Sequence, residues 1–260
     1  MRVLQNKQLG TYLIASVTIT VLISTFLLDP IAQDPAYHQF KDSRSLLGIA
    51  NFCNVVSSLA FLVVGVLGLY KILITKSLII TSDFKIAYLL LFASLSLVAL
   101  GSGYYHVSPD NKTLVWDRLP MAVGFMSLFS IIIYEFISTR FGRRALLPAI
   151  LTGIFSVIYW GMTENRGAGD LRLYILVQFL PILLTPIILV FFGSRFSHVT
   201  AYWWLFLAYL LAKLFEHFDS QIFIITGIIS GHSLKHLAAA TGFYLLLKSY
   251  ENRQLADTNR

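Results

Sequence analysis

Three histidines in this sequence are spaced as the ligands of one metal ion would be. His232 and His236 are four residues apart, so both imidazoles project from one face of a helix. His106 ends a separate apolar segment and offers a third nitrogen. Three protein ligands with one open position are typical of catalytic zinc, whereas structural zinc is closed by four. We therefore predict that these histidines bind Zn²⁺.

Two further polar residues belong with this set. Ser102 lies four residues before His106 and shares its helix face, and Asp117 opens the next apolar segment. Bound zinc activates water near neutral pH, and Asp117 would orient or deprotonate that water. Ser102 would donate a hydrogen bond to a developing oxyanion. Each residue also has a plainer alternative: Asp117 as a helix cap or a partner of Arg118, and Ser102 as a donor to its own helix.

Two acidic residues near the end of the 200–217 segment form a weaker part of the pattern. Glu216 and Asp219 could orient the metal-binding imidazoles by accepting hydrogen bonds from them. They could equally balance Lys213 and Lys235 in buried ion pairs, which is the interpretation that we prefer.

A polar stripe also runs along one face of the second apolar segment. Its members recur every three or four residues, and interhelical hydrogen bonding is the expected role of such a stripe in a membrane. The stripe consists of Asn51, Asn54, Ser57 and Ser58.

The composition places all these residues in a membrane protein. Hydrophobic residues make up 57% of the chain and charged residues 13%, against roughly 45–50% and 25% in soluble domains. That excess of apolar surface has to face lipid. The net charge of +7 does not indicate nucleic-acid binding, because the basic residues are scattered over loops and tails.

The apolar residues form segments long enough to cross a bilayer as helices, which takes about 20 residues each. We predict an all-α integral membrane protein and expect Pro120 in the first turn of the fourth helix. The fifth segment is short, and the seventh contains Lys213, Glu216 and His217. The predicted spans are 9–28, 46–70, 86–107, 119–138, 145–161, 171–193, 200–217 and 231–249.

The distribution of basic residues predicts the orientation. With the N-terminus inside, 12 Lys and Arg residues lie on the cytoplasmic side and six on the other, so both termini are expected in the cytoplasm. The first segment follows Arg2 and Lys7 but has no cleavage site of a signal peptide, so we expect it to be retained. The last residues, Asp257–Arg260, carry no retention signal, which favours the plasma (inner) membrane.

The joint pattern resembles the signature of the CREST superfamily of membrane hydrolases and receptors. Within that superfamily, three motifs look most like those of the alkaline ceramidases: Gly101-Ser-Gly-Tyr-Tyr-His106, Trp116-Asp-Arg-Leu-Pro-Met121 and Gly231-His-Ser-Leu-Lys-His236. The similarity spans residues 46–250 and implies a seven-helix domain there. It also implies an added helix with an outer loop at 1–45 and a cytoplasmic tail at 251–260.

The resemblance implies a function as well. Zinc would bind to His106, His232 and His236, with Asp117 and Ser102 assisting the hydrolysis of a lipid amide. Glu216 and Asp219 fall where the family has acidic residues. The resemblance does not extend to the family's acidic, calcium-binding N-terminal segment, because the preceding loop differs and Asn51 stands where the family has Glu.

Three functions compete on these grounds. The first is a zinc-dependent amidase acting on a ceramide-like or other N-acylated lipid, which reaches the site laterally from the bilayer. The second is a receptor of the progestin and adipoQ receptor type with the same zinc site. The third, a metal or proton transporter, ranks last because the polar residues cluster near one face rather than through the membrane depth. No nucleic-acid or protein partner is indicated.

Overall fold

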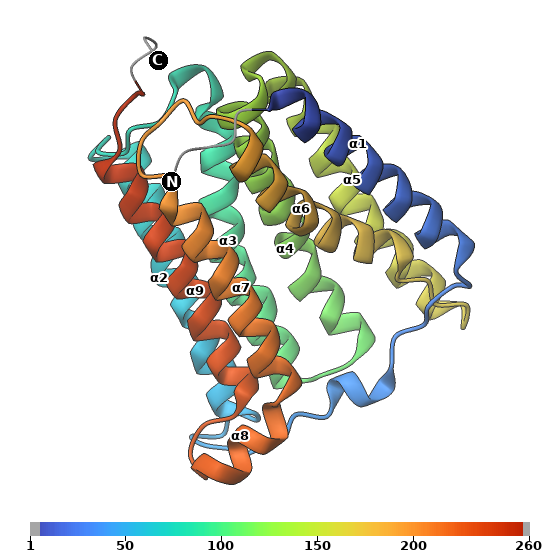
Figure 1. Ribbon diagram of the computed structural model, residues 1–260. Helices are drawn as coiled ribbons and strands as arrows, with labels where there is room; N and C mark the ends of the chain where they lie inside the picture. The colour runs from blue at the N-terminus through green and yellow to red at the C-terminus, as the bar shows by residue number, and fades with distance from the viewer. Residues whose placement is uncertain (1–5, 257–260) are drawn as a thin grey trace.

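The computed structural model describes residues 6–256, which fold into a bundle of α-helices (Figure 1). Within that range the only β-pairings are two isolated bridges. Arg2 and Asp257–Arg260, which entered the predictions of orientation and targeting, lie outside it. The helices are α1 (Lys7–Leu27), α2 (Phe52–Leu73), α3 (Lys85–Val107), α4 (Asn111–Ile132), α5 (Thr139–Asn165), α6 (Arg172–Phe191), α7 (Thr200–His217), α8 (Asp219–Thr226) and α9 (Gly231–Asn252).

Six of these helices, α1 to α6, are long and apolar enough to cross a membrane. The pair α8 and α9, bent by 105°, gives a seventh if it is one span. This confirms the prediction of an all-helical fold, and the long apolar helices are compatible with a multi-pass membrane protein. Helix α7, expected to span at 200–217, is not among the six, and its last two turns contain Lys213, Glu216 and His217.

Two helix boundaries differ from the sequence prediction for local reasons. Helix α2 begins at Phe52 rather than near residue 46, because the preceding residues form a turn in which Leu47 and Asn51 adopt left-handed backbone conformations. Helix α4 begins at Asn111, where Asp110 and Thr113 form a reciprocal capping box. Pro120 therefore lies inside α4 and not in its first turn, so that prediction is wrong. Hydropathy could not place this start, because the first turns of α4 are polar.

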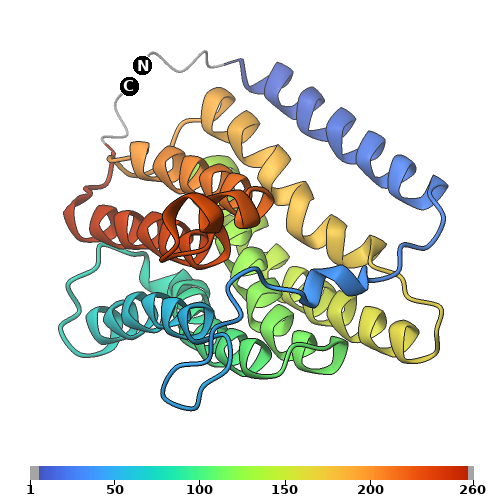
Figure 2. The ribbon, with the colours of Figure 1, turned by 90° about the horizontal axis from the view of Figure 1, so that it is seen from below.

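Helices α2 to α6 pack against one another in chain order, and α9 returns to contact α2. Helix α3 packs between α2 and α4, and α9 packs against both α7 and α2 (Figure 2). Helix α1 lies at the edge, where it contacts α6. Gly10 permits that approach, since a Cβ at this position would lie 2.6 Å from the Cβ of Phe191. The segment between α1 and α2, which includes the short helix η1 (Pro35–His38), runs across the end of the bundle.

A buried ion pair joins the helices at the opposite end, where α9 terminates. Glu135 lies in the π-helical turn η3 (Ile133–Ile137) that follows α4, and its carboxylate is 2.8 Å from Arg253 Nη1. The hydroxyls of Tyr88 and Tyr202 donate to the same carboxylate at 2.6 and 2.7 Å. Both charged side chains are almost completely buried. The pair therefore connects α3, α4, α7 and the end of α9.

Candidate metal centre

The fold brings the three predicted ligands together. His106 comes from the last turn of α3, and His232 and His236 from the first two turns of α9. Nε2 of His232 lies 3.3 Å from Nε2 of His106, and the candidate ligand nitrogens of all three side chains lie within 4.8 Å of one another. The three imidazoles are at most 6% exposed. The structure thus forms a buried cluster from residues up to 130 positions apart.

Two glycines bring the helices that carry these residues into close contact. A Cβ at Gly101 would lie 2.1 Å from the carbonyl oxygen of Trp116, so only glycine lets α3 approach α4 beside Ser102. A Cβ at Gly231 would similarly lie 2.1 Å from the carbonyl oxygen of Phe215. That second contact seats the first turn of α9 against the end of α7. Each glycine directly precedes a site residue in the sequence.

Hydroxyl groups from α2 orient one of the imidazoles. Ser57 Oγ lies 2.9 Å from Nδ1 of His236 and also donates to the carbonyl oxygen of Asn54 at 3.0 Å. In the tautomer in which Nδ1 of His236 carries the proton, Ser57 accepts from it and donates to Asn54, so both hydrogen bonds are made. The lone pair of His236 Nε2 is then free to bind a metal ion.

The rest of the polar stripe on α2 also makes the interhelical contacts that the sequence predicted. Asn51 donates to the carbonyl oxygen of His106 at 2.8 Å. Asn54 accepts a hydrogen bond from Ser233 at 2.8 Å. These contacts hold the last turn of α3 and the first turns of α9 against α2.

The α1–α2 segment covers the histidines from the end of the bundle. The ring of Phe40 packs edge-on against His106 and His232, at centroid distances of 4.7 and 4.5 Å. Asp42 is buried and accepts two hydrogen bonds from the Arg44 guanidinium, at 2.7 and 2.8 Å. These bonds hold the pKa of Asp42 below its ordinary value. Sequence reasoning missed Phe40, because no local pattern shows what a loop covers.

Ser102 and Asp117 lie beside the histidines on facing helices. Ser102 is buried on α3, and its Oγ is 3.0 Å from Ser58 Oγ. Asp117 is partly exposed two turns inside α4, rather than at the start of a helix as the sequence suggested. Both residues line the same cavity as His236. The structure therefore places a hydroxyl and a carboxylate at the cavity wall that carries the metal ligand.

The two acidic residues near the end of α7 have separate contacts. The Glu216 carboxylate accepts hydrogen bonds from the ammonium groups of Lys213, at 2.7 Å, and Lys235, at 2.6 Å. These are the ion pairs that we preferred when interpreting the sequence. Asp219 does not contact an imidazole nitrogen. Its Oδ1 instead accepts from the backbone N–H of His232 at 2.7 Å, and so anchors the first turn of α9.

The geometry of the cluster fits zinc. Two nitrogens bound to one tetrahedral zinc ion at about 2.0–2.1 Å lie about 3.3 Å apart, which is the separation of the two Nε2 atoms above. Nδ1 of His106 is the ring nitrogen outside this pair; it is buried and has no hydrogen-bond partner among the described residues, so the fit to zinc rests on the Nε2 atoms. Neutral imidazole is also a preferred zinc ligand.

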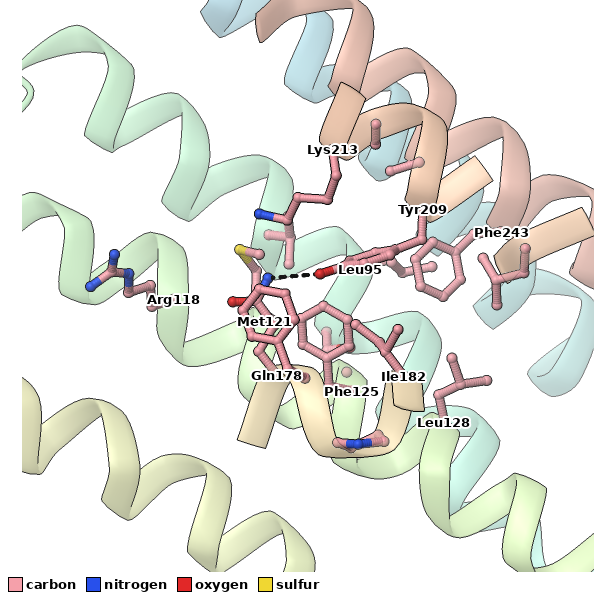
Figure 3. A pocket seen from close by; sticks show the side chains of 18 of the residues that line it. Leu95, Arg118, Met121, Phe125, Leu128, Gln178, Ile182, Tyr209, Lys213 and Phe243 are labelled. Carbon is pink, nitrogen blue, oxygen red and sulfur yellow. Dashed lines mark hydrogen bonds between the residues drawn. The ribbon is translucent and has the colours of Figure 1, made fainter. Parts of the chain in front are cut away.

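A largely apolar cavity, part of whose lining is drawn in Figure 3, reaches this cluster at His236 and continues into the bundle. Its volume is about 310 Å³, and its walls come mainly from α3, α4, α6, α7 and α9. Along α4 the lining extends from Asp117 to Ile132, a distance of about 22 Å at 1.5 Å per residue. The charged residues gather at the end near the histidines, whereas Leu128, Phe129, Ile132 and Tyr202 line the other end. The cavity therefore has the polarity of an amphiphile.

Comparison with known proteins adds no assignment. No model of a protein family, no curated protein and no solved structure matches the chain. The resemblance to the alkaline ceramidases therefore depends on the motifs quoted above.

Proposed function

We propose that this protein is a zinc-dependent amidase that hydrolyses the amide bond of a ceramide-like or other N-acylated lipid within the membrane. One observation carries the proposal: three buried histidines that fit zinc adjoin an amphiphile-shaped cavity, which His236 lines. The cavity offers about 22 Å along α4, more than the roughly 15 Å that one leaflet of a bilayer core spans. It therefore has room for the acyl chain of a membrane lipid.

The proposal includes an arrangement in the membrane. Helices α2 to α7 and α9 form a seven-helix domain, to which α1 is an N-terminal addition. The protein resides in the plasma (inner) membrane. Both termini lie in the cytoplasm, as the distribution of Lys and Arg suggests. The histidines then lie near the non-cytoplasmic surface, and a lipid reaches them laterally from the bilayer.

The residues around the site have distinct roles in this proposal. His106, His232 and His236 would hold zinc, which when bound would supply an activated water molecule and polarise a carbonyl group. Asp117 accepts the proton of the attacking water and passes it to the departing amine. Ser102 donates a hydrogen bond to the oxygen on which negative charge develops. Ser57 holds the imidazole of His236 in the tautomer that binds metal.

Phe40 and the apolar lining determine the environment of the reaction. The ring of Phe40 covers two of the imidazoles and keeps bulk water from the cluster. The acyl chain fills the apolar end of the cavity, which leaves the amide group at the polar end beside His236, Ser102 and Asp117. Removing water from this region strengthens each electrostatic interaction with the reacting group.

The direct test is lipid cleavage by the purified, zinc-loaded protein. We expect release of fatty acid from N-palmitoyl sphingoid and N-palmitoyl ethanolamine lipids, measured by mass spectrometry, and its loss in His236→Ala. His198→Asn is the matched control, because His198 is exposed in a loop at φ 59°, a conformation that asparagine tolerates. Cleavage that persists in His236→Ala rejects the metal-dependent mechanism. Lipid binding without any product would support the receptor-type alternative instead.

A further inference from the structure

A charged cluster in the cavity wall is not used by the proposed reaction. Glu216 on α7 binds Lys213 through Oε2 and Lys235 through Oε1, so one carboxylate is shared between two ammonium groups. All three residues line the cavity. A buried charge is costly unless it is paired, and this cluster contains one cation more than it contains anions.

The other charged residues of the cavity do not remove the excess. Asp117 and Arg118 also line it, which leaves three cations against two anions before any metal ion is added. The guanidinium of Arg118 donates to Gln33 at 2.7 Å and lies 4.2 Å from the centroid of the Trp160 ring. Arg118 points away from the other labelled side chains in Figure 3. The guanidinium of Arg118 is therefore engaged by Gln33 and Trp160, and the cation available to a ligand in the cavity is a lysine.

Lys213 is the better placed of the two lysines. Its side chain extends from α7 into the pocket toward Met121 and Gln178 (Figure 3). It is 40% exposed, against 17% for Lys235. An ammonium group has three donors, and Lys213 uses one of them on Glu216. Its Nζ also lies 5.7 Å from the centroid of the Phe179 ring, and the remaining donors have no hydrogen-bond partner among the described residues.

Two neutral polar groups lie on the same part of the wall. Gln178 on α6 donates to the hydroxyl of Tyr209 on α7 at 3.4 Å, one helical turn from Lys213. Gln178 is 8% exposed, so its amide is a buried polar group in an otherwise apolar helix. Together with Lys213, these side chains offer hydrogen bonds and positive charge in the wall of the cavity.

We propose that Lys213, Gln178 and Tyr209 form a subsite for a carboxylate or phosphate group, so that the protein prefers N-acyl lipids bearing such an anionic group. The placement of the acyl chain in this proposal rests on the proposed function. The anion preference does not require the amide to be cleaved.

Binding of three lipids that share one acyl amide tests the subsite. The probes are N-palmitoyl ethanolamine, which is neutral, N-palmitoyl glycine, which carries a carboxylate, and N-palmitoyl phosphoethanolamine, which carries a phosphate. Their affinities for the full chain in detergent micelles are measured by native mass spectrometry at equal metal content. We expect at least one anionic probe to bind about tenfold more tightly than the neutral one, as a charge-assisted hydrogen bond allows. The tighter anionic probe identifies the preferred group.

Three variants assign that preference to Lys213. Lys213→Met should reduce the ratio of the anionic to the neutral affinity to near one, whereas Lys213→Arg should retain it. In both variants Glu216 keeps Lys235 as its partner, so the carboxylate stays paired. Lys112→Met is the matched control: Lys112 is exposed at the start of α4 and is not among the cavity residues. Equal binding of all three probes, or an unchanged ratio in Lys213→Met, overturns the subsite. If the protein binds the anionic probe more tightly than the neutral one but cleaves no lipid, the result contradicts the proposed amidase activity and leaves the subsite supported.

Discussion

Replacing Ser57 by alanine removes the hydroxyl that lies closest to Nδ1 of His236. That hydroxyl is 2.9 Å from Nδ1, whereas Ser58 Oγ lies 3.4 Å from the same nitrogen and is the remaining partner. Loss of a hydrogen-bond partner behind a metal-binding histidine costs about 10- to 100-fold in metal affinity. Because Ser58 offers a longer bond in its place, we expect the low end, about tenfold or 1.4 kcal/mol. The double variant with Ser58→Ala should approach the high end.

Competition with a coloured zinc chelator measures this affinity in the purified protein. Ser156→Ala is the matched control, since Ser156 is also buried and donates to the carbonyl oxygen three residues before it, at 2.7 Å. The control should keep the wild-type zinc affinity, and both single variants should unfold at similar temperatures. An unchanged zinc affinity in Ser57→Ala would refute the argument that this serine sets the tautomer of His236.

Three further predictions concern the cover of the site and the far end of the bundle. Phe40→Ala uncovers two imidazoles, so the variant should lose zinc to excess EDTA roughly tenfold faster than the wild-type protein. Phe40→Leu should lose zinc at a rate between the two. The lowered pKa of Asp42 contributes stability above the unfolded value of about 3.9. Hydrogen exchange in residues 38–46, expressed relative to the intrinsic exchange rate at each pH, should therefore rise as the pH falls through the folded value, and Asp42→Asn should abolish this rise. Glu135→Gln leaves Arg253 buried without a counter-charge and should lower the free energy of unfolding by about 3–5 kcal/mol, measured by thermal unfolding. The control Asp83→Asn removes one partner of an exposed ion pair and should lower it by less than about 1 kcal/mol.

The sequence predicted the parts of this structure that follow from local patterns. Long apolar runs indicated the membrane helices, and the four-residue spacing of His232 and His236 placed both on one face of a helix. The convergence with His106 followed from counting the spans, which put all three histidines at one end of the bundle. The polar stripe on α2 likewise indicated contacts between helices.

Other features depend on contacts that no local pattern shows. Phe40 lies in a loop without periodicity, and its contact with the histidines depends on the path of that loop across the bundle. The direction of the Lys213 side chain into the cavity depends on how α7 packs against α9. Each of these features is set by packing between distant segments.

Zinc stoichiometry tests the central claim most directly. The protein, purified from zinc-replete cells without added metal, should contain one zinc ion per chain by inductively coupled plasma mass spectrometry. Separate substitutions of His106, His232 and His236 by alanine should each remove it, while His198→Asn retains it. A wild-type protein that is folded yet metal-free, or three alanine variants that keep full zinc content, would contradict the account.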